Sequence, residues 1–543
     1  MSKLGLISIA LLALSPTLSA EEVRLVIQWS PAHYTSDSSL AARSPVSQVV
    51  RFSEQQEAEA FLRANQSNIL RVEKDYRTSS FGNWQPGQDN IRQQFMMDFN
   101  SGEPFGPTGM GILSARGRST EKNSVTIAVL DSGHYPNDDI EWYLYGYDFT
   151  ERNSDTTDRF TDESGNTCFD GHGISVSSVI GSIWGNGLGT RGVLSSDSEH
   201  VNILPVRVTG YADQAEGFKC TDFNVASGWL SDKALAIRWL AGDTSHVELA
   251  NIPPYEGDKV QFINMSVGGI TEQCPAYLQE AIDVATRAGI QIIAAAGNGD
   301  HTGSPVNVSR VSPANCDGVI AVTSLAETGL DLSFSNRGSA ASVSAQGEYI
   351  PALLPEVYMG MQYYDGNGTS LSAPLVTGIM ALAYQDTGIM PNQAMTEQAT
   401  NPYLAMPSLT CERESDRDDC LGYGVLDAEK LLTIAQSVRD LGLAFISHGG
   451  NGELPCPARI RHEELARVLG NHEQLPRVVL ASPIESSLLE AVNVYELHSG
   501  VATLIATART GNTIPIRNYS ETSTYLLEAC FSGGCYETRF EVE

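Results

Sequence analysis

From residue 125 onward, apolar runs typical of buried strands alternate with longer runs that have helical periodicity. Strands apolar on both faces are typical of parallel sheets, and we expect four of them at residues 125–130, 262–265, 291–296 and 318–323. Between them, residues 222–240 and 274–287 have the spacing of helices, the second ending before Gly289. This alternation predicts an α/β fold with a doubly wound, mostly parallel sheet. A helix predicted over residues 370–384 is apolar nearly all round and should be central and buried.

The remainder of the chain divides into three parts. Residues 1–20 have the basic leader, apolar centre and small-residue end of a secretory signal peptide, with a short buried strand as the alternative. Residues 21–80 predict a small αβ unit, in which a capping box begins at Ser53. The α/β domain then occupies residues 81–445. Short strand-like runs separated by turns predict a small all-β domain, a sandwich, over residues 446–543.

The composition restricts the partners of the chain. Its 543 residues include 34 Lys and Arg against 65 Asp and Glu, a formal net charge of −31. Phosphate backbones and anionic lipid surfaces would repel such a chain, so nucleic acid is not an expected partner. Beyond residue 20 no apolar stretch reaches the ~18 residues of a membrane span. We therefore expect an exported protein without a membrane span, and a monomer.

Three polar motifs follow or open these elements, where open α/β sheets collect their functional groups. Asp131 ends the first strand in Asp-Ser-Gly, His172 opens a helical run in Asp-Gly-His-Gly, and Ser370 opens the buried helix in Gly-Thr-Ser. Each alone has an ordinary interpretation, as a turn cap, a structural histidine or a helix N-cap. Together they are the orienting acid, base and nucleophile that acyl transfer to water requires.

A fourth motif supplies a donor to the oxyanion, which the other three motifs lack. The strand at residues 291–296 is followed by Gly-Asn-Gly, which places the amide of Asn298 at the same edge of the sheet. Taken alone this is a glycine-rich turn. With the other three motifs, the amide becomes a candidate donor to the oxyanion of acyl transfer.

The four motifs resemble those of the subtilisin-like serine peptidases, the subtilases, over about residues 120–435. The resemblance implies that Asp131, His172 and Ser370 form the catalytic triad and that Asn298 donates to the oxyanion. Residues 174–175 and 371–372 depart from the family's usual Thr-His and Met-Ala, beside the triad but without removing a member of it.

The resemblance also assigns substrate binding. Extended peptide would pair with one backbone segment, and a second segment would complete an S1 slot without charge. The residues are Ser266, Val267 and Gly268 in the first segment and Ala295, Ala296 and Gly297 in the second. We therefore expect apolar or aromatic P1 residues in preference to Asp or Lys.

All nine cysteines follow the predicted signal peptide, and in an oxidising compartment disulfides are their default use. A resemblance to secreted bacterial subtilases that contain disulfides implies the pairs Cys168–Cys220 and Cys274–Cys316. Proximity in sequence suggests two further pairs, Cys411–Cys420 and Cys530–Cys535. Cys456 is then the unpaired ninth cysteine, although it could instead pair with Cys530 or with Cys535. Zinc is the alternative use, but no paired CxxC motif occurs.

By the same resemblance we expect a secreted serine endopeptidase made as a zymogen. Its partners would be protein or peptide substrates and its own propeptide, residues 21–80, acting as folding chaperone and as inhibitor with its C-terminal end in the cleft. The chemistry requires no cofactor. An acidic loop could hold structural calcium or be a solvated surface, and comprises Asp155, Asp158, Asp162 and Glu163. The alternative function is a secreted binding protein that keeps the fold without catalysis.

Overall fold

A computed structural model describes most of the chain between residues 23 and 441 and, after residue 441, describes the strands alone. The described residues are 23–29, 46–80, 83–85, 110–120, 123–161, 166–188, 190–212, 226–243, 246–300, 302–326, 328–355, 363–401, 411, 419–441, 466–469, 477–484, 489–498, 501–508, 511–515, 524–531 and 534–541. The chain divides into two compact units, residues 1–75 and residues 76–543.

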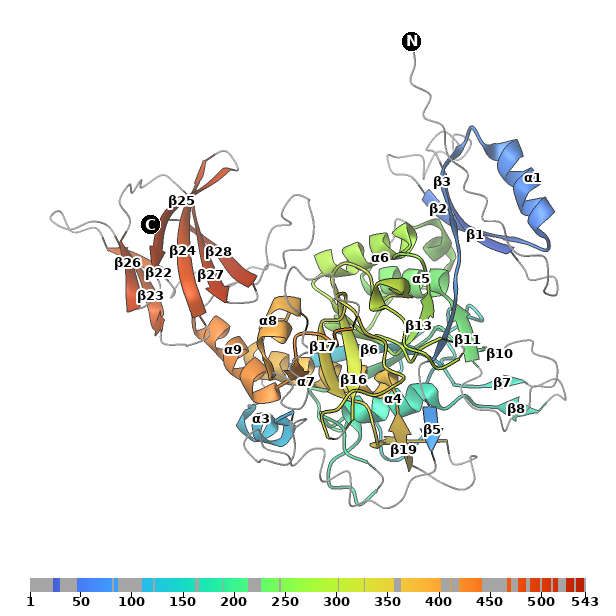
Figure 1. Ribbon diagram of the computed structural model, residues 1–543, viewed down its shortest axis with the longest axis horizontal. Helices are drawn as coiled ribbons and strands as arrows, with labels where there is room; N and C mark the ends of the chain where they lie inside the picture. The colour runs from blue at the N-terminus through green and yellow to red at the C-terminus, as the bar shows by residue number, and fades with distance from the viewer. Residues whose placement is uncertain are drawn as a thin grey trace, which may run out of the picture. The chain divides into compact units, whose positions relative to one another are not determined.

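The second unit is built on an eight-stranded sheet (Figure 1). All neighbouring strands are parallel except the last pair, β20 and β21, which are antiparallel. This confirms the predicted doubly wound, mostly parallel sheet. The order across the sheet is β20 (Thr400–Asn401), β21 (Val425–Leu426), β17 (Val343–Gln346), β16 (Val319–Leu325), β14 (Gln291–Ala295), β12 (Phe262–Met265), β6 (Val125–Asp131) and β9 (Val201–Arg207).

Helices cover both faces of this sheet, as the apolar strands require. On one side α5 (Leu230–Leu240) packs against α6 (Ala276–Arg287), and on the other α4 (His172–Gly181) and α9 (Ala428–Leu441) pack against α7 (Thr369–Thr387) (Figure 1). Nearly every residue of α7 is buried, as its apolar sequence predicts. Two shorter helices are α3 (Ile112–Arg118) and α8 (Gln393–Gln398).

The helix predicted over residues 222–240 is wrong in its first part. Residues Ala226–Trp229 form strand β11, and α5 begins only at Leu230. The reason is tertiary, because β11 pairs with β4 (Arg77–Ser80), far away in sequence.

Smaller sheets complete this unit. One has the order β10 (Tyr211–Ala212), β11, β4, β13 (Val267–Ile270) and β15 (Val311–Ser312). Another has the order β18 (Ile350–Leu353), β19 (Tyr363–Asn367) and β5 (Asn83–Gln85), and a third pairs β7 (Phe160–Thr161) with β8 (Thr167–Cys168). The first two sheets each recruit a strand from residues 77–85.

The first unit is a three-stranded antiparallel sheet with one helix. Its strands have the order β2 (Val46–Phe52), β1 (Val23–Trp29) and β3 (Ile69–Lys74), and α1 spans Gln55–Asn65. Ile27, Trp29 and Ile69 form its core, against which Phe61 of α1 packs. The capping box predicted at Ser53 is wrong, because the N-cap is Glu54 and the Ser53 hydroxyl instead donates to Glu57 Oε2 at 2.9 Å.

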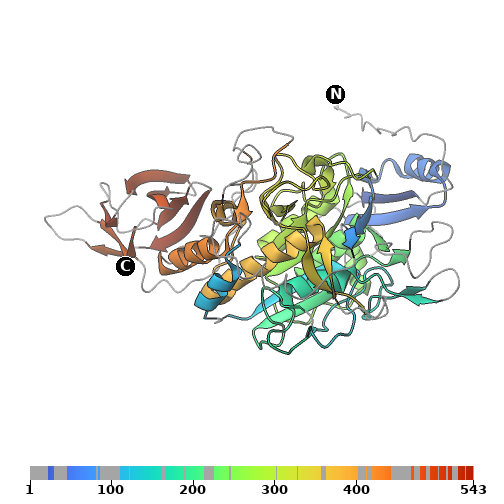
Figure 2. The ribbon, with the colours of Figure 1, turned by 60° about the horizontal axis from the view of Figure 1, so that its bottom comes forward.

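The described C-terminal strands form two antiparallel sheets (Figure 2). One has the order β22 (Ala466–Leu469), β23 (Arg477–Ile484) and β26 (Gly511–Pro515), and the other β25 (Val501–Ala508), β24 (Leu489–His498), β27 (Thr524–Phe531) and β28 (Gly534–Glu541).

Candidate active site

Asp131 and His172 meet at the carboxyl end of the central sheet. Asp131 is the last residue of β6, and His172 is the first of α4, which follows Gly171 at a φ of 76° that favours glycine. Nδ1 of His172 lies 2.8 Å from Oδ1 of Asp131, and both side chains are buried. A hydrogen bond donated by Nδ1 leaves Nε2 as the acceptor nitrogen of the ring.

The carboxylate also changes the basicity of the imidazole. Burial opposes the charged form of His172, but the charge of Asp131 and its hydrogen bond outweigh burial and raise the pKa of His172. The pair is therefore suited to receive a proton at Nε2 and hold it against Asp131.

Ser370 lies in the first turn of α7 and is 1% exposed. Pro374, four residues later, has no N–H to donate to the Ser370 carbonyl. The hydroxyl of Ser266 donates to that carbonyl instead, at 2.8 Å. Among the described residues, neither the buried Oγ of Ser370 nor the buried Nε2 of His172 has a hydrogen-bond partner. The structure therefore contains no hydrogen bond between these two atoms, although α4 and α7, which carry them, pack together.

Asn298 is held by the residue that precedes Ser370. Its Oδ1 accepts from the backbone N–H of Thr369 at 2.9 Å and from the Thr369 hydroxyl at 2.8 Å. These bonds direct the carbonyl end of the amide to Thr369 and turn its NH₂ end away. Asn336 fixes the same turn from the other side, because its Nδ2 donates to Ala296 O at 2.8 Å and its Oδ1 accepts from Gly299 N at 3.0 Å. No pattern in the sequence pointed to Asn336.

A second residue that the sequence analysis did not place in the site is Asp158. Its buried carboxylate accepts from the Ser132 hydroxyl at 2.9 Å and from the backbone N–H groups of Asp170 and Gly171 at 3.0 and 2.7 Å. Ser132 Oγ in turn accepts from Gly173 N at 3.0 Å. Asp158 thus joins the end of β6 to the start of α4, the two places that carry Asp131 and His172. Burial raises the pKa of Asp158, while the two backbone N–H groups oppose that rise.

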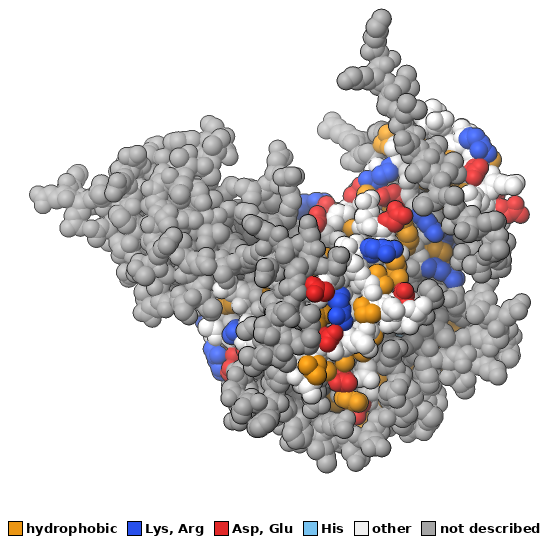
Figure 3. Space-filling model, in the orientation of Figure 1, with side chains coloured by type: hydrophobic (Ala, Val, Ile, Leu, Met, Phe, Trp, Pro, Cys, Tyr) orange, Lys and Arg blue, Asp and Glu red, His pale blue; other side chains and the backbone are white. Residues whose placement is uncertain are grey.

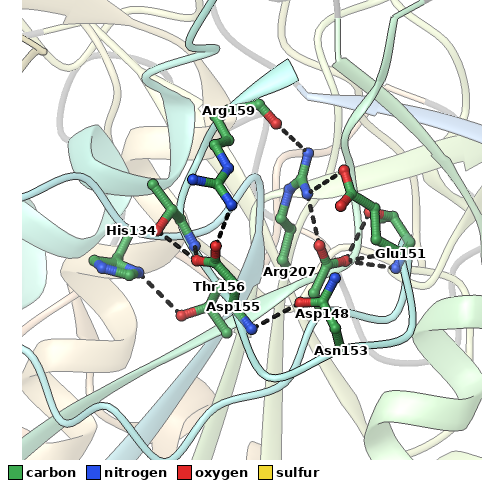
Figure 4. A network of polar contacts seen from close by, with 10 residues as sticks. His134, Asp148, Glu151, Asn153, Asp155, Thr156, Arg159 and Arg207 are labelled. Atoms are coloured by element: carbon green, nitrogen blue, oxygen red, sulfur yellow. Dashed lines mark hydrogen bonds and ion pairs between the residues drawn. The ribbon is translucent and has the colours of Figure 1, made fainter. Parts of the chain in front are cut away.

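The loop that carries Asp158 is anchored by ion pairs (Figure 4). Arg207, opposite Asp131 in the register of β9 and β6, is buried and donates to Asp148 Oδ2 at 2.6 Å and to the carbonyl of Arg159 at 2.6 Å. His134 bonds Thr156 at 3.0 Å, and Arg159 pairs with Asp155. The loop is therefore fixed on both sides of Asp158.

The predicted substrate segments lie beside Ser370. Ser266, Val267, Ala295 and Ala296 are all buried, and Val267 and Gly268 belong to β13. The edge of β13 is already paired, since β4 lies antiparallel between β13 and β11. Residues 77–80 thus take the place that the sequence analysis expects for an extended peptide.

The model of the subtilase family, Peptidase_S8, matches residues 122–408 of this sequence. The chain belongs to the subtilase family. The match includes all three residues predicted as a triad and Asn298.

Relatives of this subtilase are proteases by name. The "Extracellular protease" of Xanthomonas campestris is 31% identical over 357 residues, which are 61% of this chain and 55% of that protein. The "Thermostable alkaline protease" of Halalkalibacterium halodurans is 28% identical over 309 residues, 56% of this chain and 70% of the relative. A solved structure of a protease from Pseudoalteromonas arctica has a TM-score of 0.48 at 25% identity and covers 64% of this chain and 99% of its own.

The subtilase contains predicted disulfides. Cys274–Cys316 and Cys411–Cys420 are both bonded, which confirms these two pairs. Cys168 is disulfide-bonded, while its predicted partner Cys220 lies outside the described residues, as does Cys456. Cys530 and Cys535 stand opposite each other in the register of β27 and β28, and their pairing stays a prediction.

The two described residues of the acidic loop, Asp155 and Asp158, have different environments in this subtilase. Asp155 is exposed and accepts from Thr157, whereas Asp158 is buried in the network beside His172. Asp162 and Glu163 lie outside the described residues. The described part of the chain contains no group of three or more His, Cys, Asp or Glu suited to a metal, and structural calcium stays a prediction. Acidic and basic side chains are interspersed on the described surface in Figure 3.

No helix in the described ranges is both long and apolar enough to cross a bilayer.

Proposed function

We propose that this chain is a secreted serine endopeptidase, made as a zymogen, that hydrolyses protein or peptide substrates. The observation that carries the proposal is the buried His172–Asp131 pair, together with His172 Nε2 and Ser370 Oγ, to which no group in the described part of the chain is hydrogen-bonded. Family membership and the protease names of the relatives support it.

Each residue has one role in the proposed reaction. Ser370 Oγ attacks the peptide carbonyl carbon and transfers its proton to His172 Nε2, while Asp131 holds the tautomer and stabilises the imidazolium. The tetrahedral intermediate breaks its C–N bond, and His172 returns the proton to the leaving amine. Water then hydrolyses the ester by the same steps and restores the Ser370 hydroxyl.

Two donors would bind the oxyanion of the intermediate. One is the NH₂ end of Asn298, which the bonds between its Oδ1 and Thr369 direct. The other is the backbone N–H of Ser370, in the first turn of α7, where the helix dipole adds positive potential. Loss of one such donor typically raises the barrier by about 2.7–4 kcal/mol.

The position of β4 supports a zymogen. Because residues 77–80 bond the edges of both β11 and β13, no other extended peptide can pair with those edges until β4 leaves. The predicted signal peptide and the name of the Xanthomonas relative support secretion.

Labelling with a fluorophosphonate tests the proposal, because only a serine activated by its base reacts with this probe. The secreted protein should be labelled on Ser370, and labelling should be lost in Ser370→Ala and His172→Ala. Ser309→Ala, at an exposed serine, is the matched control and should be labelled like the original chain. A mature secreted protein that takes no label would be a binding protein rather than an enzyme, and equal labelling after Ser370→Ala would contradict the role of Ser370 as the nucleophile.

A further inference from the structure

Three buried serines follow His172 along α4, and their hydroxyls are used differently. Ser175, Ser177 and Ser178 are each at most 1% exposed. The hydroxyls of Ser175 and Ser178 bond strand β18, whereas the Oγ of Ser177 has no hydrogen-bond partner in the described part of the chain. The helix that begins with the proposed base therefore carries two serines that bond a neighbouring strand and one that does not.

The two bonded hydroxyls hold Leu353, the last residue of β18. Ser175 Oγ donates to the Leu353 carbonyl at 2.7 Å, and the Leu353 N–H donates to Ser178 Oγ at 3.0 Å. Ser178 Oγ also donates to the carbonyl of Ser175 at 2.7 Å. Ser175 Oγ lies 2.8 Å from a second acceptor, the carbonyl of Gly171, which precedes His172. Because Leu353 is 1% exposed and β18 is an outer strand of its sheet, its backbone groups need partners from outside the sheet, which the two serines supply.

Strand β18 is in turn bonded to the start of α7. It pairs antiparallel with β19, the strand that leads into α7. Just before β18, the carbonyl of Gly347 accepts from the N–H of Gly368, the N-cap of α7, at 2.8 Å. The N–H of Tyr349 donates to Asn367 Oδ1 at 2.7 Å. The segment before and within β18 is therefore fixed to the helix turn that carries Ser370.

A serine of α7 bonds the same segment. Ser372, two residues after Ser370, is fully buried and donates to the carbonyl of Gln346 at 2.9 Å. Ser175 and Ser372 both stand where this chain departs from the usual family sequence. Their hydroxyls bond the two ends of residues 346–353, one from each helix. These departures thus join the helix of the base to the helix of the nucleophile.

Resting on the proposed function, we propose that Ser175 and Ser178 are positioning residues, which set the distance between base and nucleophile by holding α4 to β18. The two reacting atoms, His172 Nε2 and Ser370 Oγ, share no hydrogen bond in the structure. Proton transfer between such atoms requires a separation of about 2.6–3.2 Å, and a misplacement of about 1 Å can cost about 100-fold in rate. Since β18 is fixed to the start of α7, the bonds from α4 to β18 control where the base lies relative to the nucleophile.

The first experiment compares three alanine variants of α4 by peptide hydrolysis. Ser175→Ala and Ser178→Ala should each lower kcat about tenfold or more and leave KM within about twofold, because the predicted substrate segments lie at β13 and β14. Ser177→Ala is the matched control, equally buried on the same helix, and should keep kcat within about twofold. Equal values of kcat for Ser175→Ala and Ser177→Ala would overturn the proposal.

A second pair of variants distinguishes positioning from a loss of stability. Threonine and valine have nearly the same shape, but only threonine has a hydroxyl. Ser175→Thr should keep kcat within about threefold, whereas Ser175→Val should lower it as Ser175→Ala does. Active enzyme is counted by fluorophosphonate labelling to completion, so that unfolded protein does not enter kcat. A Ser175→Val enzyme with unchanged kcat per labelled Ser370 refutes the role of Ser175, even if its urea midpoint falls.

A double variant tests whether the two hydroxyls act as one unit. Because both bond the same residue, Leu353, their effects should not multiply. The chain with Ser175→Ala and Ser178→Ala together should have a kcat within about threefold of the lower single variant. Losses that multiply in full contradict a shared hold on β18.

Fluorophosphonate labelling of the original chain separates this inference from the proposed function. A mature protein that takes no label on Ser370 contradicts the proposed function itself. A labelled enzyme whose Ser175→Ala and Ser178→Ala variants keep their kcat contradicts only the positioning role.

Discussion

Removing the Cys274–Cys316 disulfide should destabilise the fold more than removing Cys411–Cys420. The first closes a separation of 42 residues and the second a separation of 9. In the chain-entropy model the free energy of unfolding falls by about 4.0 kcal/mol when the first is lost and by about 2.6 kcal/mol when the second is lost. The expected difference is about 1.4 kcal/mol, from loop length alone.

The assay uses two double variants, Cys274→Ala with Cys316→Ala and Cys411→Ala with Cys420→Ala, each with Ser370→Ala to prevent self-digestion. Urea unfolding followed by tryptophan fluorescence gives the midpoint and slope for each chain. The Ser370→Ala chain with all cysteines is the reference. Equal losses, or a larger loss for Cys411–Cys420, would refute the argument from loop length.

Three further predictions concern the site and the charge. Asn298→Ala should lower kcat about 100- to 1000-fold with little change in KM, measured by peptide hydrolysis. The base must be neutral to accept a proton, and the pKa of His172 is raised. We therefore expect kcat/KM to fall as the pH drops through a value above about 6.5. A pH–rate profile in which kcat/KM falls only below about pH 6 would contradict the contact with Asp131. Asp158→Asn removes one acceptor oxygen and leaves a backbone N–H group without a partner. The value of kcat should therefore fall about tenfold or more, and the pH at which kcat/KM falls should shift. The control is Asp155→Asn, in the same loop but exposed, which should keep kcat within about twofold of the original.

The parts of the site that depend on local sequence were predictable. Asp131 follows a strand whose apolar run is continuous, and Ser370 opens a helix that is apolar all round, so both positions follow from periodicity alone. Because the strands of this sheet were predicted to be parallel, the end of the first strand and the start of this helix were expected to meet at the carboxyl edge of the sheet. The Cys274–Cys316 pair, by contrast, was inferred only from the family resemblance.

The groups that position the site depend on distant contacts, and periodicity carries no signal for them. Asp158 belongs to a stretch of acidic residues that is equally consistent with a solvated surface, and only the fold brings it to Ser132 and Gly171. Lys233 occurs in a helical run where lysine usually indicates exposure, yet it is buried because Thr78 and Val208 offer it oxygens. The strand at Ala226–Trp229 was missed for the same reason, since β4 supplies its hydrogen bonds.

The middle position of β4 also determines what its departure would leave behind. Without it the five-stranded sheet separates into β10–β11 and β13–β15, two open edges that face each other across the width of one strand, about 9–10 Å. Open edges bind extended backbone of almost any sequence, which would suit the proposed hydrolysis of peptide substrates and would also allow pairing between copies of the protein. While β4 stays in place, the newly made chain has neither edge exposed. In the proposed zymogen, the strand that delays activity would therefore also keep these two edges from pairing with another copy of the protein.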